Sequence, residues 1–129
     1  MILLDTHVLL WMASDPSCLS RAAREAIRRN REQSGIAVAA ITLWELSWLA
    51  QNNRIVVTGS VESFVRETVA RVILRPITPE IAAQAARLPR QFPRDPADRL
   101  IAATALIEGA PLITADKSIR QSELLPTIW

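Results

Sequence analysis

Short runs of consecutive apolar residues alternate with longer helical patterns along the whole chain, and this alternation restricts the folds open to it. The apolar runs predict strands at residues 2–5, 36–39, 72–76, 112–114 and 127–128. Helices are predicted at residues 7–13, 21–34, 42–51, 60–70, 79–88 and 96–108, with a short one from residue 117. Strands that are apolar on both faces are typical of parallel sheets covered by helices on both sides, so we expect an α/β fold.

Capping signals support several of the predicted helix boundaries. Ser20 is the expected N-cap of the second helix, and Thr42 with Glu45 matches the capping-box pattern at the start of the third. Pro96 falls in a first helical turn, where its missing backbone N–H is not needed. Gly109 follows the same helix, and glycine at this position commonly ends a helix.

Length and composition favour a single globular domain over residues 1–129. Half of the residues are hydrophobic, and no apolar stretch is long enough to cross a membrane. The N-terminus lacks the basic segment and the small-residue cleavage site of a signal peptide, so we predict a soluble, cytoplasmic protein. The single cysteine, Cys18, cannot form an internal disulfide, and we expect it to be a small buried apolar residue rather than a reactive thiol.

Every basic side chain except Lys117 is an arginine, although the net charge is only +2. Arginine suits phosphate because its planar guanidinium donates several hydrogen bonds. We interpret the arginines of residues 21–31 as the solvent-exposed face of a helix. In a second group, over residues 87–99, Arg94 and Arg99 are candidates for contacts with a substrate phosphate, and Arg99 could equally pair with a neighbouring acid.

Four acidic residues fall where a parallel α/β sheet places its binding sites. Asp5 ends the first predicted strand, and Asp116 follows the strand that carries Thr114. Glu45 and Asp98 each lie in the first turn of a predicted helix. Ligands of open parallel sheets bind beyond the carboxyl ends of the strands, so we expect all four carboxylates near one pocket.

Each of these acids also has a simpler interpretation as part of a helix cap. Asp5, Asp95 and Asp116 precede predicted helices, while Glu45 and Asp98 stand where a capping box places its acid. Taken together the four site acids favour another role, because clustered carboxylates repel one another and are kept mainly to bind a hard cation. A set of ligands that binds only through oxygen atoms suits Mg²⁺ or Mn²⁺. Asp95 retains the cap interpretation.

Other catalytic chemistries have little support in the sequence. His7 is the only histidine, which excludes a histidine pair and a zinc site of ordinary composition. Cys18 has no catalytic partner in its sequence context, and the three glycines form no phosphate-binding loop. The remaining chemistry, a metal held by acids, acts most often on phosphodiesters.

Four segments, in order, resemble the PIN-domain nucleases and, among them, the VapC-like toxins of bacterial toxin–antitoxin pairs. The segments are LLDTHVLLW at residues 3–11, ITLWEL at 41–46, DPADRLIAATA at 95–105 and LITAD at 112–116. Together they extend the resemblance over essentially the whole chain. Each segment alone is a weak signal, but all four in order are specific.

The resemblance implies a three-layer α/β/α domain with a five-stranded parallel sheet in the order 3-2-1-4-5. It implies that Mg²⁺, for which Mn²⁺ can substitute, is bound by Asp5, Glu45, Asp98 and Asp116. Asp5 and Asp98 are the first choice as direct ligands, and Glu45 and Asp116 either bind a second metal or orient metal-bound water. Thr114 would support the site, and Thr6 is a second supporting candidate. The implied activity is endonucleolytic cleavage of RNA that leaves 5′-phosphate and 3′-hydroxyl ends.

Partners are also implied by the resemblance: a homodimer, and a small antitoxin that lays a helix and an extended tail across the protein. Trp11, Trp44 and Trp48 lie on predicted helices with more apolar surface than one core-facing side needs, so deep burial and partner contact both remain open for them. The chain departs from its relatives at Ala97, where they often carry an aromatic residue, and at Arg94, near which they often carry a histidine. Neither position supplies a metal-binding acid.

Two alternatives to a toxin remain. One is a housekeeping nuclease of the same family, and the other is a non-catalytic RNA-binding or regulatory module on the same scaffold. A non-catalytic module would be expected to lack a site acid, and none is missing here. A phosphoacceptor signalling domain fits poorly, because no second acid adjoins Asp5 and the only lysine is Lys117.

Overall fold

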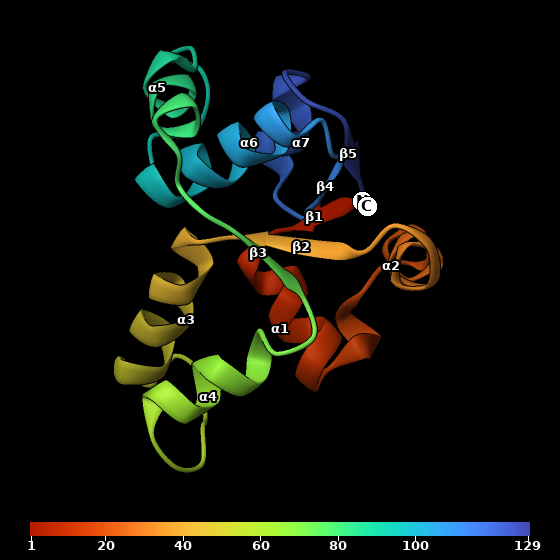
Figure 1. Ribbon diagram of the computed structural model, residues 1–129, viewed down its shortest axis with the longest axis vertical. Helices are drawn as coiled ribbons and strands as arrows, with labels where there is room; N and C mark the ends of the chain where they lie inside the picture. The colour runs from red at the N-terminus through yellow and green to blue at the C-terminus, as the bar shows by residue number, and fades with distance from the viewer.

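The computed structural model describes residues 1–129 and contains a five-stranded parallel sheet with helices on both sides (Figure 1). The strands are β1 (Ile2–Leu4), β2 (Ile36–Ala39), β3 (Ile73–Arg75), β4 (Leu112–Ile113) and β5 (Thr127–Ile128). Their order in the sheet is β3-β2-β1-β4-β5, which places the first strand of the chain at the centre. The predicted α/β class and strand order are confirmed.

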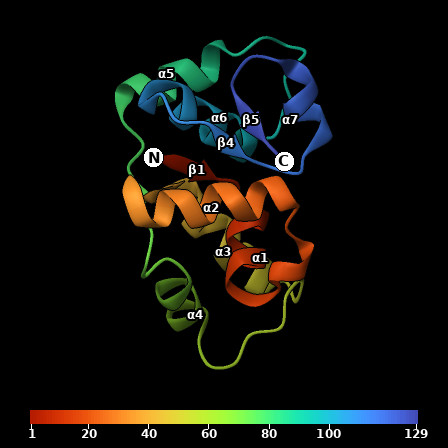
Figure 2. The same ribbon diagram turned by 90° about the vertical axis from the view of Figure 1, so that its right-hand side faces the viewer.

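Helices form a layer on each face of the sheet. They are α1 (Thr6–Ser14), α2 (Arg21–Gln33), α3 (Ile41–Gln51), α4 (Val61–Thr68), α5 (Pro79–Arg87), α6 (Pro96–Glu108) and α7 (Lys117–Ser122), with a short 3₁₀ turn at Pro16–Cys18. Helices α1–α4 lie on one side of the sheet and α5–α7 on the other, as Figures 1 and 2 show. None of the helices combines the length and the apolar character that a membrane span requires.

The central strand explains why the apolar runs in the sequence are uninterrupted. Side chains alternate across a strand, so β1 sends Ile2 and Leu4 to one face and Leu3 to the other. Ile2 and Leu4 pack in the core cluster that contains Val8 of α1, whereas Leu3 packs in a second cluster with Ile101 of α6. Both faces of β1 are therefore buried, as in other parallel sheets.

The sheet edge formed by β3 differs from this pattern. Its residues Ile73 and Leu74 are 42% and 43% exposed, although we expected every strand to be buried on both faces. The third residue, Arg75, forms a 2.6 Å ion pair with Glu108 at the end of α6. An exposed apolar edge strand has unpaired backbone groups and is a site where another chain can add.

Local capping chemistry is as predicted at two helix ends. The Ser20 side chain accepts a hydrogen bond from the Ala23 backbone N–H at 3.0 Å, so Ser20 is the N-cap of α2. Gly109 adopts a φ of 64° after α6, a left-handed conformation that costs glycine little. These contacts confirm the predicted start of α2 and end of α6.

The capping box predicted for Thr42 and Glu45 is wrong. Helix α3 begins at Ile41, so Thr42 lies inside its first turn, and the residue at the cap position makes no side-chain cap bond. Thr42 is buried, and its hydroxyl oxygen lies 3.0 Å from that of Thr6 on α1. The sequence pattern is local, whereas the packing of α1 against α3 decides what this threonine contacts.

Cys18 is exposed, so its predicted burial is also wrong. It lies in the 3₁₀ turn, and the core position in this segment is taken by the adjacent Leu19, which is 5% exposed. The Cys18 thiol donates to the Asp15 carboxylate at 3.2 Å, and this hydrogen bond raises the pKa of the thiol. A raised pKa lowers the thiolate fraction at neutral pH. That Cys18 is not a reactive thiol stays a prediction.

Candidate active site

Five acidic side chains line one hollow beyond the carboxyl ends of the central strands. Its volume is about 410 Å³, and the lining acids are Asp5, Glu45, Asp95, Asp98 and Asp116. His7, Trp11 and Ala115 complete the lining, so no lysine or arginine offsets the negative charge. The structure thus brings together all four acids expected from the sequence, and we call this hollow the acid pocket. Their role as metal ligands stays a prediction.

Helix caps hold three of these acids in place. The carboxylates of Asp5, Asp95 and Asp116 each accept a hydrogen bond of 3.0 Å or less from a backbone N–H at the start of α1, α6 and α7, respectively. The cap interpretation is therefore confirmed for these three residues. It is wrong for Glu45 and Asp98, because neither of their carboxylates accepts a hydrogen bond from a backbone N–H.

Asp95 is the acid that the sequence interpretation left out of the site. It does cap α6 as predicted, but it also lines the acid pocket. Its position three residues before Asp98 at the same helix start was the available signal. A cap and a pocket residue are compatible roles, because capping uses one carboxylate oxygen only.

Thr114 links two acids at the end of β4. Its hydroxyl donates to Asp5 Oδ2 at 2.7 Å and accepts the backbone N–H of Asp116 at 3.1 Å. Thr114 is fully buried, so this hydroxyl has one arrangement available to it. The two hydrogen bonds fix the Asp5 carboxylate relative to the segment that carries Asp116.

Thr6 performs a similar task across the helices α1 and α3. Its hydroxyl donates to Glu45 Oε1 at 2.5 Å, and the hydroxyl of Thr42 lies 3.0 Å away as the donor to Thr6. The chain of two buried hydroxyls leaves Glu45 Oε2 without a hydrogen-bond partner in the protein. This free oxygen is available to a water or another ligand in the pocket.

Desolvation and repulsion between charges raise the pKa of three carboxyls in the acid pocket. The pKa of Asp98 rises from 3.8 to about 7, first because of burial and then because of the charges of Asp95, Asp5, Asp116 and Glu45. Burial likewise raises the pKa of Asp5 and of Glu45, although hydrogen bonds from Thr114 and Thr6 oppose the rise. Each proton that leaves these carboxyls adds negative charge that no lysine or arginine in the lining offsets.

The donor set of the acid pocket fits a hydrated hard cation. All candidate ligands are carboxylate oxygens, the type that Mg²⁺ and Mn²⁺ prefer. No three of the acids are arranged to coordinate one ion directly. This matches Mg²⁺, which keeps several waters and is commonly held by one or two carboxylates. A divalent cation would also relieve the repulsion that raises the pKa of Asp98.

Arg99 was expected to contact a substrate phosphate or to pair with an acid, and the structure shows a different role for it. Its five guanidinium N–H groups donate to five backbone carbonyls, at 3.0 to 3.3 Å. These carbonyls belong to Ala85, Leu88, Pro89, Phe92 and Pro93, which end α5 and form the loop before α6. Arg99 forms no ion pair, so the expectation that it could pair with a neighbouring acid is wrong. With all its donors engaged, Arg99 holds the loop that leads into Asp95 and is not retained as a substrate contact.

Arg94 differs from Arg99 in having no partner. It is exposed beside Asp95, and it makes no ion pair or side-chain hydrogen bond. An exposed guanidinium next in sequence to Asp95, which lines the acid pocket, is a candidate for a phosphate contact. Its contact with substrate stays a prediction.

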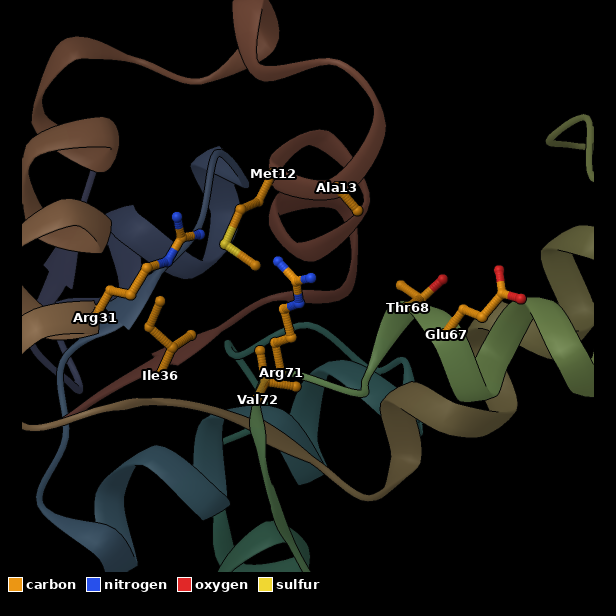
Figure 3. Close-up of a pocket in the computed structure, with 8 residues that line it drawn as sticks. All are labelled: Met12, Ala13, Arg31, Ile36, Glu67, Thr68, Arg71 and Val72. Atoms are coloured by element: carbon orange, nitrogen blue, oxygen red, sulfur yellow. The ribbon is translucent and has the colours of Figure 1, made fainter.

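A second hollow lies away from the acid pocket, at the amino ends of β2 and β3. Its volume is about 470 Å³, and Arg31 and Arg71 point into it beside Met12 and Ile36 (Figure 3). Arg31 belongs to the arginines of α2, which are all exposed, as predicted for the solvent face of a helix. The hollow has one acid in its lining and none of the site residues, so it is no candidate for the metal chemistry.

The fold and the acid pocket together define a class: a parallel α/β protein whose functional pocket is a carboxylate cluster at the carboxyl ends of its strands. The family model of the PIN domain matches residues 2–123. Ribonuclease VapC22 of Mycobacterium tuberculosis (strain ATCC 25618 / H37Rv) is 45% identical over 119 residues, which are 92% of this chain and 89% of that protein. The chain belongs to the PIN-domain family.

Solved structures with the same fold include two from toxin–antitoxin systems. VapBC2 from Rickettsia felis, bound to a DNA fragment from its promoter, matches with a TM-score of 0.74 and 17% identity over 98% of this chain and 97% of that chain. VapBC-5 from Mycobacterium tuberculosis, a member of the VapBC family of toxin–antitoxin systems, matches with a TM-score of 0.61 and 22% identity, covering 97% and 92% of the two chains. At these identities the likeness concerns the fold.

Proposed function

We propose that this protein is a metal-dependent endoribonuclease and the toxin of a toxin–antitoxin pair. The observation that carries the proposal is the acid pocket, with five carboxylates and no cationic side chain in its lining. A relative that is 45% identical over most of the chain has the name ribonuclease, which supports RNA as the substrate. Structural neighbours from toxin–antitoxin systems support an antitoxin as the partner. We propose that the protein acts in the cytoplasm, where such a toxin would meet RNA.

In the proposed mechanism the chain's acids hold Mg²⁺, for which Mn²⁺ substitutes. When bound, the ion supplies charge stabilisation at the phosphate and lowers the pKa of a water. Asp5 and Asp98 are the proposed direct ligands, and Thr114 keeps the Asp5 carboxylate in place. Glu45 and Asp116 either bind a second ion or orient the attacking water.

The proton of the attacking water also needs an acceptor. Glu45 Oε2 is the proposed acceptor, since Oε1 is already held by the Thr6 hydroxyl and a raised pKa makes this carboxylate a better base. In-line attack of that water on phosphorus would break the P–O3′ bond. The departing oxygen would take a proton from solvent, which gives a 3′-hydroxyl on one product and a 5′-phosphate on the other. Arg94 is the proposed contact to a neighbouring phosphate of the RNA.

We also propose a homodimer. The exposed apolar residues of the sheet edge, Ile73 and Leu74 on β3 and Ile77 after it, offer a surface for a second copy. An antitoxin would then bind to each copy. Light scattering on the purified protein gives the oligomeric state.

Cleavage of RNA by the purified chain should require a divalent metal. We expect single-stranded RNA to be cut with Mg²⁺ or Mn²⁺, and the rate to fall at least about a hundredfold in excess chelator, because the acids alone cannot stabilise the charge that develops on phosphate. The measurement is the initial rate on a labelled RNA. Full activity in chelator, followed by no increase when Mg²⁺ is restored, would rule out the mechanism.

Expression of the chain without its antitoxin should arrest bacterial growth. The Asp5→Asn variant should relieve the arrest, because it removes a proposed metal ligand while the amide oxygen can still accept the cap bond from the Thr6 backbone N–H. Growth curves at matched protein levels test this. Equal growth of the two strains would contradict the toxin assignment and favour a housekeeping nuclease or a non-catalytic RNA-binding module.

A further inference from the structure

Two large aromatic side chains are exposed on α3 beside the acid pocket. Trp44 is 57% exposed and Trp48 is 43% exposed, so deep burial is excluded for both. They stand four residues apart and therefore share one face of the helix. With Leu49 they line a hollow of about 260 Å³, which we call the aromatic hollow. The rest of its lining also lines the acid pocket, and consists of His7, Glu45 and Asp95.

The other two tryptophans are placed differently. Trp11 and Trp129 lie against each other with their ring centroids 5.7 Å apart, and both pack against the core. Trp48 has Arg54 beside its ring, with the guanidinium carbon 5.8 Å from the centroid. Arg54 is exposed and forms no ion pair. The flat rings that line the aromatic hollow thus have one uncommitted positive charge beside them, Arg54, which lies outside the lining itself.

We propose that Trp44 and Trp48 form a base-stacking platform that binds a nucleotide next to the scissile phosphate of single-stranded RNA. The proposal rests on the proposed ribonuclease function and adds a substrate-binding site to it. Unpaired bases stack on aromatic side chains with little dependence on sequence, because every base has a flat face. The guanidinium of Arg54, beside the Trp48 ring, would meet the phosphate of the stacked nucleotide.

The aromatic hollow suits a nucleotide better than a second copy of this chain. A dry contact between two protein surfaces would remove water from Glu45 and Asp95, and no lysine or arginine lines the hollow to compensate their charge. A base is uncharged and small, so it can lie on the tryptophan rings while the carboxylates stay hydrated. His7, Glu45 and Asp95 line both hollows, so such a base would lie next to the acids of the acid pocket.

Binding of short RNAs to paired variants tests the platform. The probes are labelled RNA hexanucleotides, one intact and a set with a single abasic position each, titrated in Mg²⁺ into protein carrying Asp98→Asn so that the RNA stays uncut. We expect Trp48→Ala to weaken binding of the intact RNA about tenfold, the size of one lost stack, and Trp48→Phe to restore most of it. Ile107→Ala shortens an exposed apolar side chain at the far end of α6, and this control should bind the intact RNA as well as the Asp98→Asn protein does.

The abasic probes separate stacking from a general effect on structure. With the Asp98→Asn protein that keeps both tryptophans, RNA that lacks one particular base should bind about tenfold more weakly than intact RNA. In the protein that also carries Trp48→Ala, loss of the same base should weaken binding no further, because the base and the Trp48 ring form one interaction. The proposal would be overturned if the intact RNA bound equally to the Asp98→Asn protein and to its Trp44→Ala and Trp48→Ala variants. So would a tenfold loss that is independent of the missing base, or light scattering that shows Trp48→Ala dissociating a dimer.

The same data keep this proposal distinct from the proposed function. RNA cleavage by the wild-type chain, together with equal binding by all variants, leaves the ribonuclease in place and removes the platform. Binding that depends on Trp48 and on one base, in a chain that never cleaves RNA, supports the platform and removes the ribonuclease.

Discussion

The Asp98→Asn variant should lose RNA cleavage by about a thousandfold or more while remaining folded. Asp98 is one of two proposed direct ligands, and the amide that replaces it has no negative charge to offer a divalent cation. Metal-bound charge stabilisation is worth several kcal/mol, and about 4 kcal/mol corresponds to a thousandfold in rate. Initial rates at saturating Mg²⁺, with circular dichroism as a check of folding, measure the effect. A variant with the wild-type rate would remove Asp98 from the site.

The same substitution should stabilise the metal-free protein near neutral pH. Asp98 has a pKa of about 7 in the folded protein and about 3.8 without the fold, so folding favours its protonated form. Its contribution to stability is therefore complete below pH 4 and is lost as the pH rises toward 7. The wild type in chelator should lose on the order of 2 kcal/mol relative to Asp98→Asn across this interval, a value reduced for partial solvent exposure.

Urea unfolding at three pH values measures this difference directly. At pH 4 the two proteins should have similar free energies of unfolding in chelator, and by pH 7 the variant should be the more stable. Two stability curves that run parallel from pH 4 to 7 would show that the Asp98 carboxylate is not repelled by its neighbours.

The Arg99→Ala variant should be strongly destabilised. It would remove a donor from five carbonyls. Those of Ala85 and Pro89 would keep a backbone N–H partner, and those of Leu88, Phe92 and Pro93, in the loop before α6, would be left unpaired. Hydrogen bonds from a charged group, together with the cost of unpaired carbonyls, give a loss on the order of 4 kcal/mol. For a chain of this length the melting temperature should fall by roughly 15 °C. Thermal unfolding followed by circular dichroism is the measurement.

Two matched substitutions show whether the loss comes from hydrogen-bond geometry. Arg99→Lys keeps the charge but cannot reach five carbonyls with one ammonium, so it should recover less than half of the lost stability. Arg94→Ala removes an exposed arginine without partners and should change the melting temperature by about 1 °C or less. Equal melting temperatures for the alanine variants at 94 and 99 would contradict the clamp assigned to Arg99.

The positions of the site acids follow from the sequence, for a simple reason. The carboxyl ends of parallel strands meet at one edge of a sheet, so an acid that ends β1 and one that follows β4 must come close once the strands pair. Asp5 and Asp116 were therefore predictable neighbours. The strand order came from the resemblance, because apolar runs alone do not say which strands adjoin.

Contacts that depend on the path of a loop or on helix packing were not predictable. Arg99 meets its carbonyls only because the proline-containing loop folds back along α6, and nothing in its local sequence indicates that path. Thr42 fits a capping pattern, yet the packing of α1 against α3 turns its hydroxyl toward Thr6. The exposure of Trp48 likewise depends on which neighbours α3 has, and its own apolar pattern cannot report that.

Four melting curves test most directly whether the acid pocket is one metal site: wild type and Asp116→Asn, each in chelator and in Mn²⁺. Asp116 caps α7, and Asn caps helices about as well as Asp, so the exchange separates capping from charge. In chelator the variant should melt above the wild type, because one repelling carboxylate is gone. Mn²⁺ at about 100 times its dissociation constant should stabilise the wild type by roughly 2.7 kcal/mol, or about 10 °C, and the variant should lose most of that gain. A variant that melts at or below the wild type in chelator, and responds equally to Mn²⁺, would show that Asp116 is a cap and no part of a metal site.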